Sequence, residues 1–386
     1  MIKEIKKNPM YWYILLLVVA ITIGFQAWRT LLNNYAVDEV GINGLQMGVI
    51  QSIREIPGFL ALLVVYLLLI FKEHRLAAFS TLLLGAGVMS AGFFPSFGGL
   101  IVTTLIMSIG FHYFETVNQS LTLQYFQGKQ APVMIGRIKS MGALTNIIVG
   151  AIIWIISPYM SLKMQFIAFG AVVIMLALTA FSKNPVDKNL PIQHKKMILR
   201  KKYWLFYTLN FLSGARRQIF VVFAVFMLVE KYHFQVKEIA ILFILNNIAT
   251  YFISPLVAKA INKFGERAIL TVEYSSLIIL FLCYAFIEDK SVVAVLYVID
   301  HIFFSASMAI NTFFQKTADA KDIAPSMAVG FTINHISAVV IPVIGGALWM
   351  INWRIPFIGG AVIAVLSLVF SQMTTIQRRK LQETLQ

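Results

Sequence analysis

Long apolar runs, separated by short polar segments, dominate the chain. Twelve such runs lie near residues 10–36, 44–71, 75–94, 98–126, 131–157, 164–182, 203–231, 237–262, 266–287, 290–317, 322–351 and 354–376. Each is long enough, as a helix, to cross the hydrocarbon core of a bilayer. Because lipid offers the backbone no hydrogen-bond partners, the runs are expected to be helices. The pattern therefore predicts an all-α integral membrane protein with twelve transmembrane helices.

Composition supports the same class of protein. Hydrophobic residues make up 59% of the 386 and charged residues 13%, whereas soluble domains carry about 25% charged residues. The net charge is +15, but the cations lie in short segments between apolar runs, so no nucleic-acid partner is expected. The single cysteine, Cys283, excludes a disulfide within one chain. The first run is too long for the apolar core of a signal peptide.

Positive charge is distributed unevenly over the segments that join the runs. Alternate segments hold most of the lysines and arginines, including the N-terminus, the segment 183–202 and the C-terminal tail. Cytoplasmic segments of membrane proteins carry such an excess. Both termini and the 183–202 segment are therefore predicted to be cytoplasmic, in a multi-pass protein of the cell inner membrane. The same segment divides the chain into an N-terminal six-helix bundle (1–182), a basic linker (183–202) and a C-terminal six-helix bundle (203–386).

The two halves share short motifs at a constant offset. Y-F-Q at 125–127 recurs as F-F-Q at 313–315, and G-x-x-x-N at 142–146 recurs at 330–334. By the same offset Arg29 corresponds to Arg217, and His112 to Asp300. Internal repeats of this kind occur in transporter folds. They predict that the two six-helix bundles are pseudo-symmetric.

Two further motifs carry a resemblance to the major facilitator superfamily. The segment 258–270, A-K-A-I-N-K-F-G-E-R-A-I-L, is similar to the loop signature G-x-x-x-D-R-x-G-R-R of that family, with Asn262 where the family often has Asp. P-V-I-G-G at 342–346 is similar to its Pro-Gly-Gly element, and we expect these glycines to serve helix packing. The arginine common in helix 4 of proton-coupled exporters is missing. The resemblance implies the major facilitator fold, with the first helix of each half lining a central cavity.

Polar side chains recur at helical spacing inside several apolar runs. The first run carries Gln26, Arg29 and Asn33 on one face, and the seventh carries Asn210 and Arg217. Charged residues at this depth usually face a bundle interior or a water-filled cavity. We therefore expect a central solute path. The candidate substrate-binding residues are Gln26, Arg29, Asn33, Asn146, Asn210, Arg217, Asn246, Asn334 and His335.

A second group of polar residues suits proton exchange. Burial disfavours a charged carboxylate and a nearby arginine favours it, so a buried acid can load and release a proton as its surroundings change. The candidates are His112, Glu115, Asp300 and His301. For several of these polar residues, hydrogen bonding between helices is the alternative role.

Four charged residues are assigned to ion pairs or gating: Arg54, Glu55, Arg216 and Glu273. Arg216 points about 100° away from Arg217 on a helix, so the two arginines are expected to have different roles. Arg216 could pair with Glu273 or with Asp300. As sequence neighbours, Arg54 and Glu55 should not face each other, although Glu55 remains a candidate partner for Arg29 or Arg54. Arg29 itself could instead act as a gate, paired with Asp38 or Glu55.

These residues predict a secondary active transporter that moves a small, anionic organic solute by alternating access, either proton-coupled or by exchange. Arg29 and Arg217 would form a two-sided clamp, because the guanidinium fork fits carboxylate or phosphate oxygens. Alternatives are proton-coupled efflux of drug-like compounds, favoured by the aromatic and methionine content, and a membrane sensor or scaffold that moves no solute.

Other classes of function are not expected. The sequence has no Walker A motif and no hydrolase motif, so neither an enzyme nor an ATP-driven pump is predicted. The histidines are scattered over different runs, and neither a metal site nor a cofactor is expected. The expected partners are the solute, protons or a counter-anion, and the lipid bilayer around a monomer.

Overall fold

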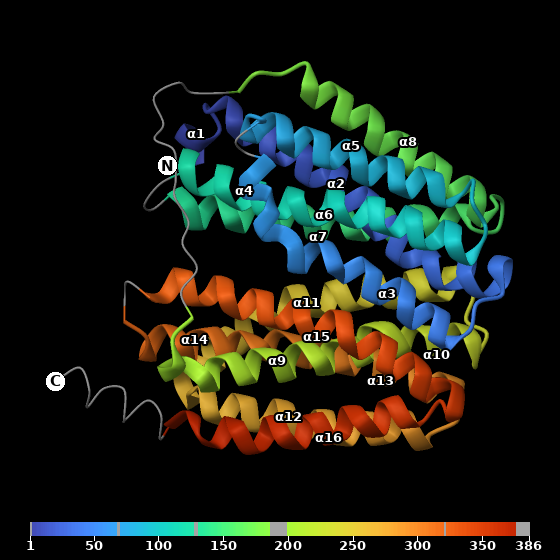
Figure 1. Ribbon diagram of the computed structural model, residues 1–386, viewed down its shortest axis with the longest axis vertical. Coiled ribbons are helices and arrows are strands. Elements are labelled where there is room, and N and C mark those ends of the chain that lie inside the picture. Colours follow the sequence, from blue (N-terminus) through green and yellow to red (C-terminus); the bar gives the residue numbers. More distant parts are fainter. Residues whose placement is uncertain (1, 68–69, 127–129, 186–198, 320–321, 376–386) are drawn as a thin grey trace. The chain divides into compact units, whose positions relative to one another are not determined.

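A computed structural model describes residues 2–67, 70–126, 130–185, 199–319 and 322–375 (Figure 1). All regular structure in these residues is helical. Ten helices in the described part of the chain are long and apolar enough to cross a membrane. The two remaining predicted crossings, 44–71 and 75–94, also coincide with helices. The helical character of the predicted runs is therefore confirmed, whereas most of the 183–202 linker lies outside the described residues.

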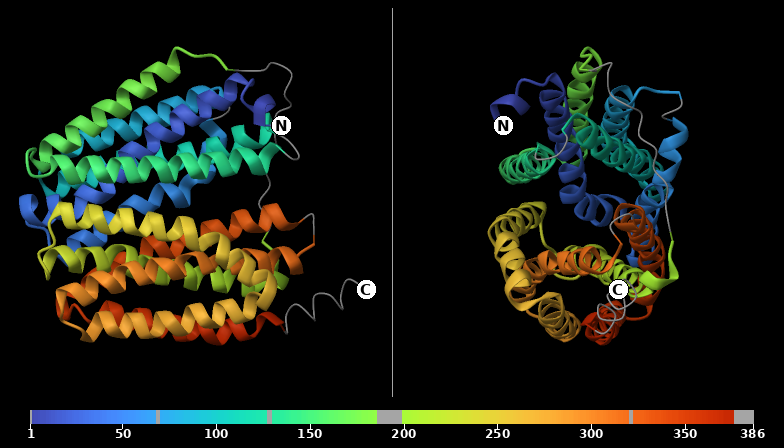
Figure 2. Two further views of the ribbon diagram at one scale, coloured as in Figure 1. Left: turned by 180° about the vertical axis from the view of Figure 1, so that it is seen from behind. Right: turned by 90° about the vertical axis from the view of Figure 1, so that its left-hand side faces the viewer.

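The chain divides into two compact units, and each is described by itself. Unit 1 consists of Met1–Ile42, Ile53–His194 and Gln235–Ile244. Its elements are α1 (Ile2–Ile5), α2 (Pro9–Asn34), the π-helical segment η1 (Tyr35–Val40), the end of α3 (Gly44–Phe59), the 3₁₀ segment η2 (Leu60–Leu63), α4 (Val64–Leu67), α5 (Glu73–Ala91), α6 (Phe97–Tyr125), α7 (Gln130–Ile156), α8 (Leu162–Phe181) and the start of α11 (Val236–Phe264). Helix α5 packs against both α6 and α8, and α2 packs against α7 and α8 (Figures 1 and 2).

Unit 2 consists of Asn43–Ser52, Lys195–Phe234 and Leu245–Gln386. Its elements are the start of α3, the 3₁₀ segment η3 (Lys201–Tyr203), α9 (Trp204–Gln218), the π-helical segment η4 (Ile219–Ala224), α10 (Val225–Glu230), most of α11, α12 (Glu266–Phe286), α13 (Lys290–Phe304), the 3₁₀ segment η5 (Ser305–Ser307), α14 (Met308–Thr317), α15 (Ile323–Ile351) and α16 (Ile355–Gln372). Helix α12 lies along α16, and α9 packs against α15 (Figure 1).

Local sequence signals account for where the helices begin and end. The side chain of Asn8 accepts a hydrogen bond from the N–H of Met10 at 2.9 Å, and Pro9 opens α2. Ser96 caps α6 in the same way. Gly41 and Gly265 follow η1 and α11 with φ values of 72° and 84°, a left-handed conformation that favours glycine.

Several predicted runs are not uniform α-helices. In the run 44–71, Pro57 lies near the end of α3, and the 3₁₀ segment η2 follows. A proline inside a helix removes one backbone hydrogen bond, which favours a break there. The run 290–317 is likewise interrupted, by η5. The first helices of both halves continue into π-helical segments, η1 and η4. At these places the predicted helical runs contain short 3₁₀ or π-helical segments besides α-helix.

Close packing in both units depends on small residues. A Cβ on Gly87 of α5 would lie 2.7 Å from the Cα of Met107 on α6. In unit 2, a Cβ on Gly346 would lie 2.7 Å from the carbonyl oxygen of Gly44 at the start of α3. Both distances are too short for any larger side chain without a shift of backbone. The packing role expected for the P-V-I-G-G motif is confirmed at Gly346.

Candidate functional site

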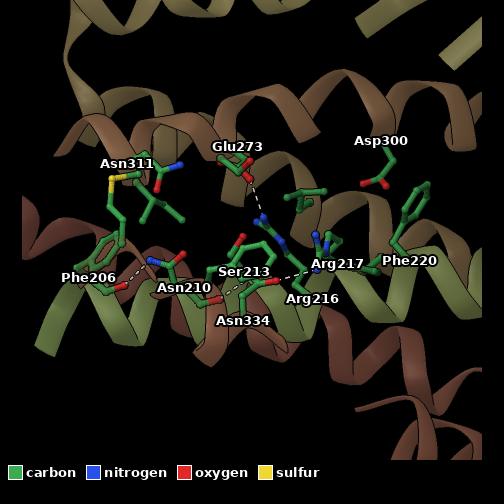
Figure 3. A pocket seen from close by; sticks show the side chains of 16 residues that line it. Phe206, Asn210, Ser213, Arg216, Arg217, Phe220, Glu273, Asp300, Asn311 and Asn334 are labelled. Atoms are coloured by element: carbon green, nitrogen blue, oxygen red, sulfur yellow. Dashed lines mark hydrogen bonds and ion pairs between the residues drawn. The ribbon is translucent and has the colours of Figure 1, made fainter. Parts of the chain in front are cut away.

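Unit 2 contains a cavity of about 360 Å³ between α9, α12, α13, α14 and α15 (Figure 3). This is within the usual size range of small-molecule sites. Its lining residues are Phe206, Asn210, Ser213, Arg216, Arg217, Phe220, Glu273, Leu277, Phe281, Asp300, Ser307, Ile310, Asn311, Met327, Phe331 and Asn334. Six of these were expected from the sequence to line a path or to hold a charge: Asn210, Arg216, Arg217, Glu273, Asp300 and Asn334.

Arg217 of α9 is hydrogen-bonded to Asn334 of α15, which in turn bonds back to the backbone of α9. Its Nη2 donates to Oδ1 of Asn334 at 2.7 Å, and Nδ2 of Asn334 donates to the carbonyl oxygen of Asn210 at 3.1 Å. The helices approach closely here, because a Cβ on Gly214 would lie 2.7 Å from the carbonyl oxygen of Asn334. The glycine thus places Asn334 within reach of the arginine. The result is a guanidinium and two amides on one wall of the cavity (Figure 3).

Arg216 forms a buried ion pair with Glu273. The distance from Nη2 of Arg216 to Oε1 of Glu273 is 2.7 Å, and the two side chains are 7% and 0% exposed. The guanidinium carbon also lies 4.9 Å from the ring centroid of Tyr274. Of the two partners considered for Arg216, Glu273 makes the direct contact. A pair this deeply buried is costly to break, since removal of one partner leaves a charge in an apolar interior.

Asp300 is buried next to the same cavity. Asp300 is 2% exposed. Among the described residues, no hydrogen-bond donor reaches its Oδ2 atom. The neighbouring His301 does not line the cavity, and its ring packs 5.4 Å from that of Phe220 and 5.5 Å from that of Tyr297. Of the neighbours Asp300 and His301, Asp300 is therefore the one that a solute or a proton in the cavity can reach.

The polar stripe of α2 lies in unit 1. Nη2 of Arg29 donates to Oε1 of Gln26 at 2.7 Å, and Nε2 of Gln26 donates to Oγ1 of Thr30 at 3.2 Å. The guanidinium carbon of Arg29 lies 4.6 Å from the ring centroid of Phe243, near the start of α11. Asn33 is 6% exposed on the same helix. Arg29 thus combines a hydrogen bond within its own helix and a cation–π contact.

Arg54 and Glu55 form a direct ion pair in unit 1. The expectation that these neighbours would not face each other is wrong, because both side chains are long enough to bend toward one another. Ser108 of α6 also donates to the backbone carbonyl oxygen of Arg54. Of the two arginines considered for Glu55, the structure records the pair with Arg54.

The other predicted residues have varied surroundings. In unit 1, His112 is 4% exposed, whereas Glu115 is exposed and Asn146 is half-buried. In unit 2, Asn246 and His335 are buried, and the ring of His335 packs 4.5 Å from that of Phe331. Neither lines the cavity described above. The predicted residues therefore form two sets, one in each unit, and six members of the unit 2 set line the cavity described above.

Sequence reasoning missed part of the cavity wall. Ser307 and Asn311 follow Asp300 by seven and eleven residues, a spacing that places all three on one helical face. That signal was present in the sequence. The four phenylalanines of the wall, Phe206, Phe220, Phe281 and Phe331, carried no such signal, because phenylalanine is abundant throughout the apolar runs.

A separate polar cluster lies where α9 begins. The hydroxyl of Tyr203 donates to Oδ2 of Asp322 at 2.9 Å, and Nε of Arg200 lies 2.6 Å from the same oxygen. Lys202 pairs with Asp319 at 2.7 Å. Burial opposes ionisation of Asp322, but the Tyr203 and Arg200 contacts outweigh it and hold the pKa of this carboxyl below its ordinary value. The cluster ties the chain before α9 to the connection between α14 and α15.

The membrane-spanning helices, together with a cavity lined in part by charged and polar residues, indicate a multi-pass membrane protein of the transporter class. Residues 14–342 match the model of the Major Facilitator Superfamily, and the chain belongs to this family. The nucleoside transporter NupG has a similar structure, with a TM-score of 0.74 and 16% identity over 95% of this chain and 98% of that one. A bacterial homologue of the human lysosomal transporter Spinster, inward-facing and unoccupied, gives a TM-score of 0.75 and 13% identity over 97% and 98%. No curated protein sequence matches.

These findings confirm the predicted fold, the all-α major facilitator fold of two six-helix bundles. The family consists of transporters rather than enzymes, and its members bind small-molecule solutes within the membrane. At the identities observed, the similarity to the solved structures establishes the fold alone.

Proposed function

We propose that this protein is a secondary active transporter that moves a small, anionic organic solute by alternating access. The two predicted bundles, 1–182 and 203–386, would move relative to each other about a central site. Both termini and the 183–202 linker would be cytoplasmic, in the cell inner membrane. The protein would work as a monomer, and the drive would come from protons or from exchange against another anion.

The observation that carries the proposal is the cavity wall formed by Asn210, Arg217 and Asn334. A guanidinium keeps its charge at any physiological pH and presents paired donors to carboxylate or phosphate oxygens. The two amides beside it add donors and acceptors that suit a polar solute. Burial of such a group inside a membrane span is costly, which favours a functional role over a packing role.

Arg29 is the proposed second contact, from the corresponding helix of the other half. It carries the same fork, and Gln26 and Asn33 share its helical face. The clamp remains a proposal for the transport cycle. It requires that both arginines reach one solute in at least one conformation.

Asp300 and Glu115 are the proposed proton carriers. Asp300 is buried beside the cavity, where a change of surroundings shifts the balance between its charged and neutral forms. Glu115 is exposed on α6 and is the second choice.

Solute counterflow in proteoliposomes tests this function. Purified protein is first screened by thermal shift against carboxylated, phosphorylated and cationic compounds, with nucleosides added because NupG transports them. The best stabiliser is then used as a radiolabelled solute. We expect accumulation against unlabelled internal solute, abolished in Asn334→Ala and retained in the control Asn352→Ala, whose side chain is exposed at the end of α15. If no compound supports counterflow, the protein senses or scaffolds instead.

Efflux of drug-like compounds is a second candidate, favoured by the four phenylalanines in the cavity wall. Such rings offer a large apolar contact area that can accommodate ligands in several orientations. The same screen separates the two, because a drug exporter would be stabilised by lipophilic cations and by neutral aromatics. An anion transporter would be stabilised by carboxylates or phosphates.

A further inference from the structure

Four charged residues line the cavity of unit 2, and their signs balance. They are Arg216, Arg217, Glu273 and Asp300. The first arginine and Glu273 neutralise each other through their direct ion pair. The other two charged residues of the lining are Arg217, which donates to Asn334, and Asp300. A solute that carried only negative charge would match the cation, and the acid would face no positive group of the solute.

The acid is placed to meet a positive group. Asp300 is 2% exposed, and among the described residues nothing hydrogen-bonds to its Oδ2. A buried carboxylate oxygen without a donor is unfavourable unless a ligand or a proton supplies one. Figure 3 shows Asp300 at the same end of the cavity as Phe220, apart from the Arg216–Glu273 pair.

One aromatic ring of the lining, that of Phe220, lies at this end of the cavity, and two tyrosine rings pack against it. Tyr297 precedes Asp300 by three residues and so shares its face of α13. The ring of Tyr297 stacks on that of Phe220 at 5.0 Å, and the ring of Tyr284 lies 6.2 Å from Phe220. Aromatic faces attract organic ammonium groups. Small metal cations prefer a shell of oxygen ligands instead, which rings do not offer.

We propose that Asp300 and Phe220 form a subsite for an ammonium group, and that the solute of this cavity is a small zwitterion whose acidic group binds Arg217. This rests on the proposed transport function and narrows its substrate class. Asn210 and Asn334 beside the arginine would hold the acidic group, and the remainder of the solute would face Phe206 and Asn311.

The subsite also gives Asp300 a defined role in coupling. One carboxylate cannot hold a proton and an ion-paired ammonium at the same time. The ammonium of the solute therefore takes the place of the proton on Asp300. Binding of the zwitterion releases a proton when Asp300 is protonated beforehand.

Matched ligand sets test the subsite on the purified full-length protein. Each α- and ω-amino acid is compared by calorimetry with its deaminated acid and its decarboxylated amine. We expect at least one zwitterion to bind about tenfold more tightly than both analogues. Asp300→Asn should abolish this preference, while the affinity for the deaminated acid stays within about twofold. Phe220→Leu should reduce the preference partly, and it provides the test if Asp300→Asn does not fold. Glu230→Gln, an exposed acid at the end of α10, is the control.

The outcomes separate this inference from the proposed function. If deaminated acids bind as tightly as zwitterions, or if Asp300→Asn weakens both equally, the ammonium subsite is wrong and anion transport stands. Tight binding of amines alone would also overturn it. If neither acids nor zwitterions bind, both proposals fail together.

Discussion

Arg29 and Arg217 hold corresponding positions in the two halves of the chain, yet their surroundings differ. Arg29 donates to Gln26, three residues earlier on its own helix, and lies over the ring of Phe243. Arg217 donates to Asn334 on a different helix and lines a cavity. An arginine thus recurs at the same offset in both halves of the sequence. The recorded contacts of these two arginines differ between the units.

The helices that carry His112 and Asp300 show the same divergence. In unit 1, α6 runs from Phe97 to Tyr125 without a break. Its counterpart in unit 2 is divided into α13 and α14 by the 3₁₀ segment η5. The break lies five residues beyond Asp300, and Ser307 of η5 lines the cavity. Non-α segments within helices often mark functional positions, and this one contributes a residue to the cavity wall of unit 2.

The largest expected effect is loss of the buried Arg216–Glu273 pair. Glu273→Leu leaves a guanidinium in an apolar interior, and we expect a loss of about 3–5 kcal/mol in the free energy of unfolding. The double variant Arg216→Leu/Glu273→Leu should recover much of it, because no charge is then left unpaired. Denaturation of the purified variants in detergent measures both. Equal stability of the single and double variants would show that the pair is not the cause.

The comparison of the two arginines predicts the next largest effect. Arg217→Lys keeps the charge but loses the fork, and we expect the affinity for the best anionic ligand to fall by about ten- to a hundredfold. Arg29→Lys should weaken binding as well if the clamp exists, and less strongly because Arg29 does not line the cavity of unit 2. Calorimetric titration decides. Near-native affinity in both variants would exclude the clamp and favour a neutral or cationic solute.

A smaller effect is expected at the cation–π contact of Arg29. Phe243→Leu keeps the apolar volume and removes the ring, and we expect a stability loss of about 0.5–2 kcal/mol. A matched control is Phe243→Tyr, which retains an aromatic face. The melting temperature of the tyrosine variant should stay close to that of the wild type. If leucine and tyrosine are equivalent, the ring face contributes nothing to Arg29.

The smallest expected effect concerns pH and the cluster around Asp322. The folded pKa of this carboxyl lies below its ordinary value of 3.8, so its pairing with Arg200 stabilises the fold above that pH. The contribution is lost as pH falls through the lower, folded pKa. The melting temperature of Asp322→Asn should therefore lie below wild type by a constant amount between about pH 5 and 8. The difference should shrink under more acidic conditions. A difference that grows with acidity would contradict this assignment.

Much of the fold was predictable from the sequence. In water-free surroundings a backbone must satisfy its own hydrogen bonds, so a long apolar run has one stable solution, the helix. The runs near 98–126 and 266–287 correspond to α6 and α12 within a residue or two. The breaks at η2 and η5 were not predicted. They depend on how each segment packs, with Pro57 as the only local signal.

For the candidate site, the sequence by itself determined which helical positions carry charge: Arg29, Arg217, Arg216 and Asp300 stand out because a charge in an apolar run is costly. The sequence could not decide which residues these charges contact. Helical spacing shows which face of a helix a side chain is on, but not how far that face lies from another helix. Only the tertiary structure chose Glu273 rather than Asp300 for Arg216. It also joined Arg217 to Asn334 through the close approach at Gly214 and placed Asp300 and Phe220 in the wall of one cavity. These choices depend on contacts between segments far apart in the chain, which no local pattern encodes.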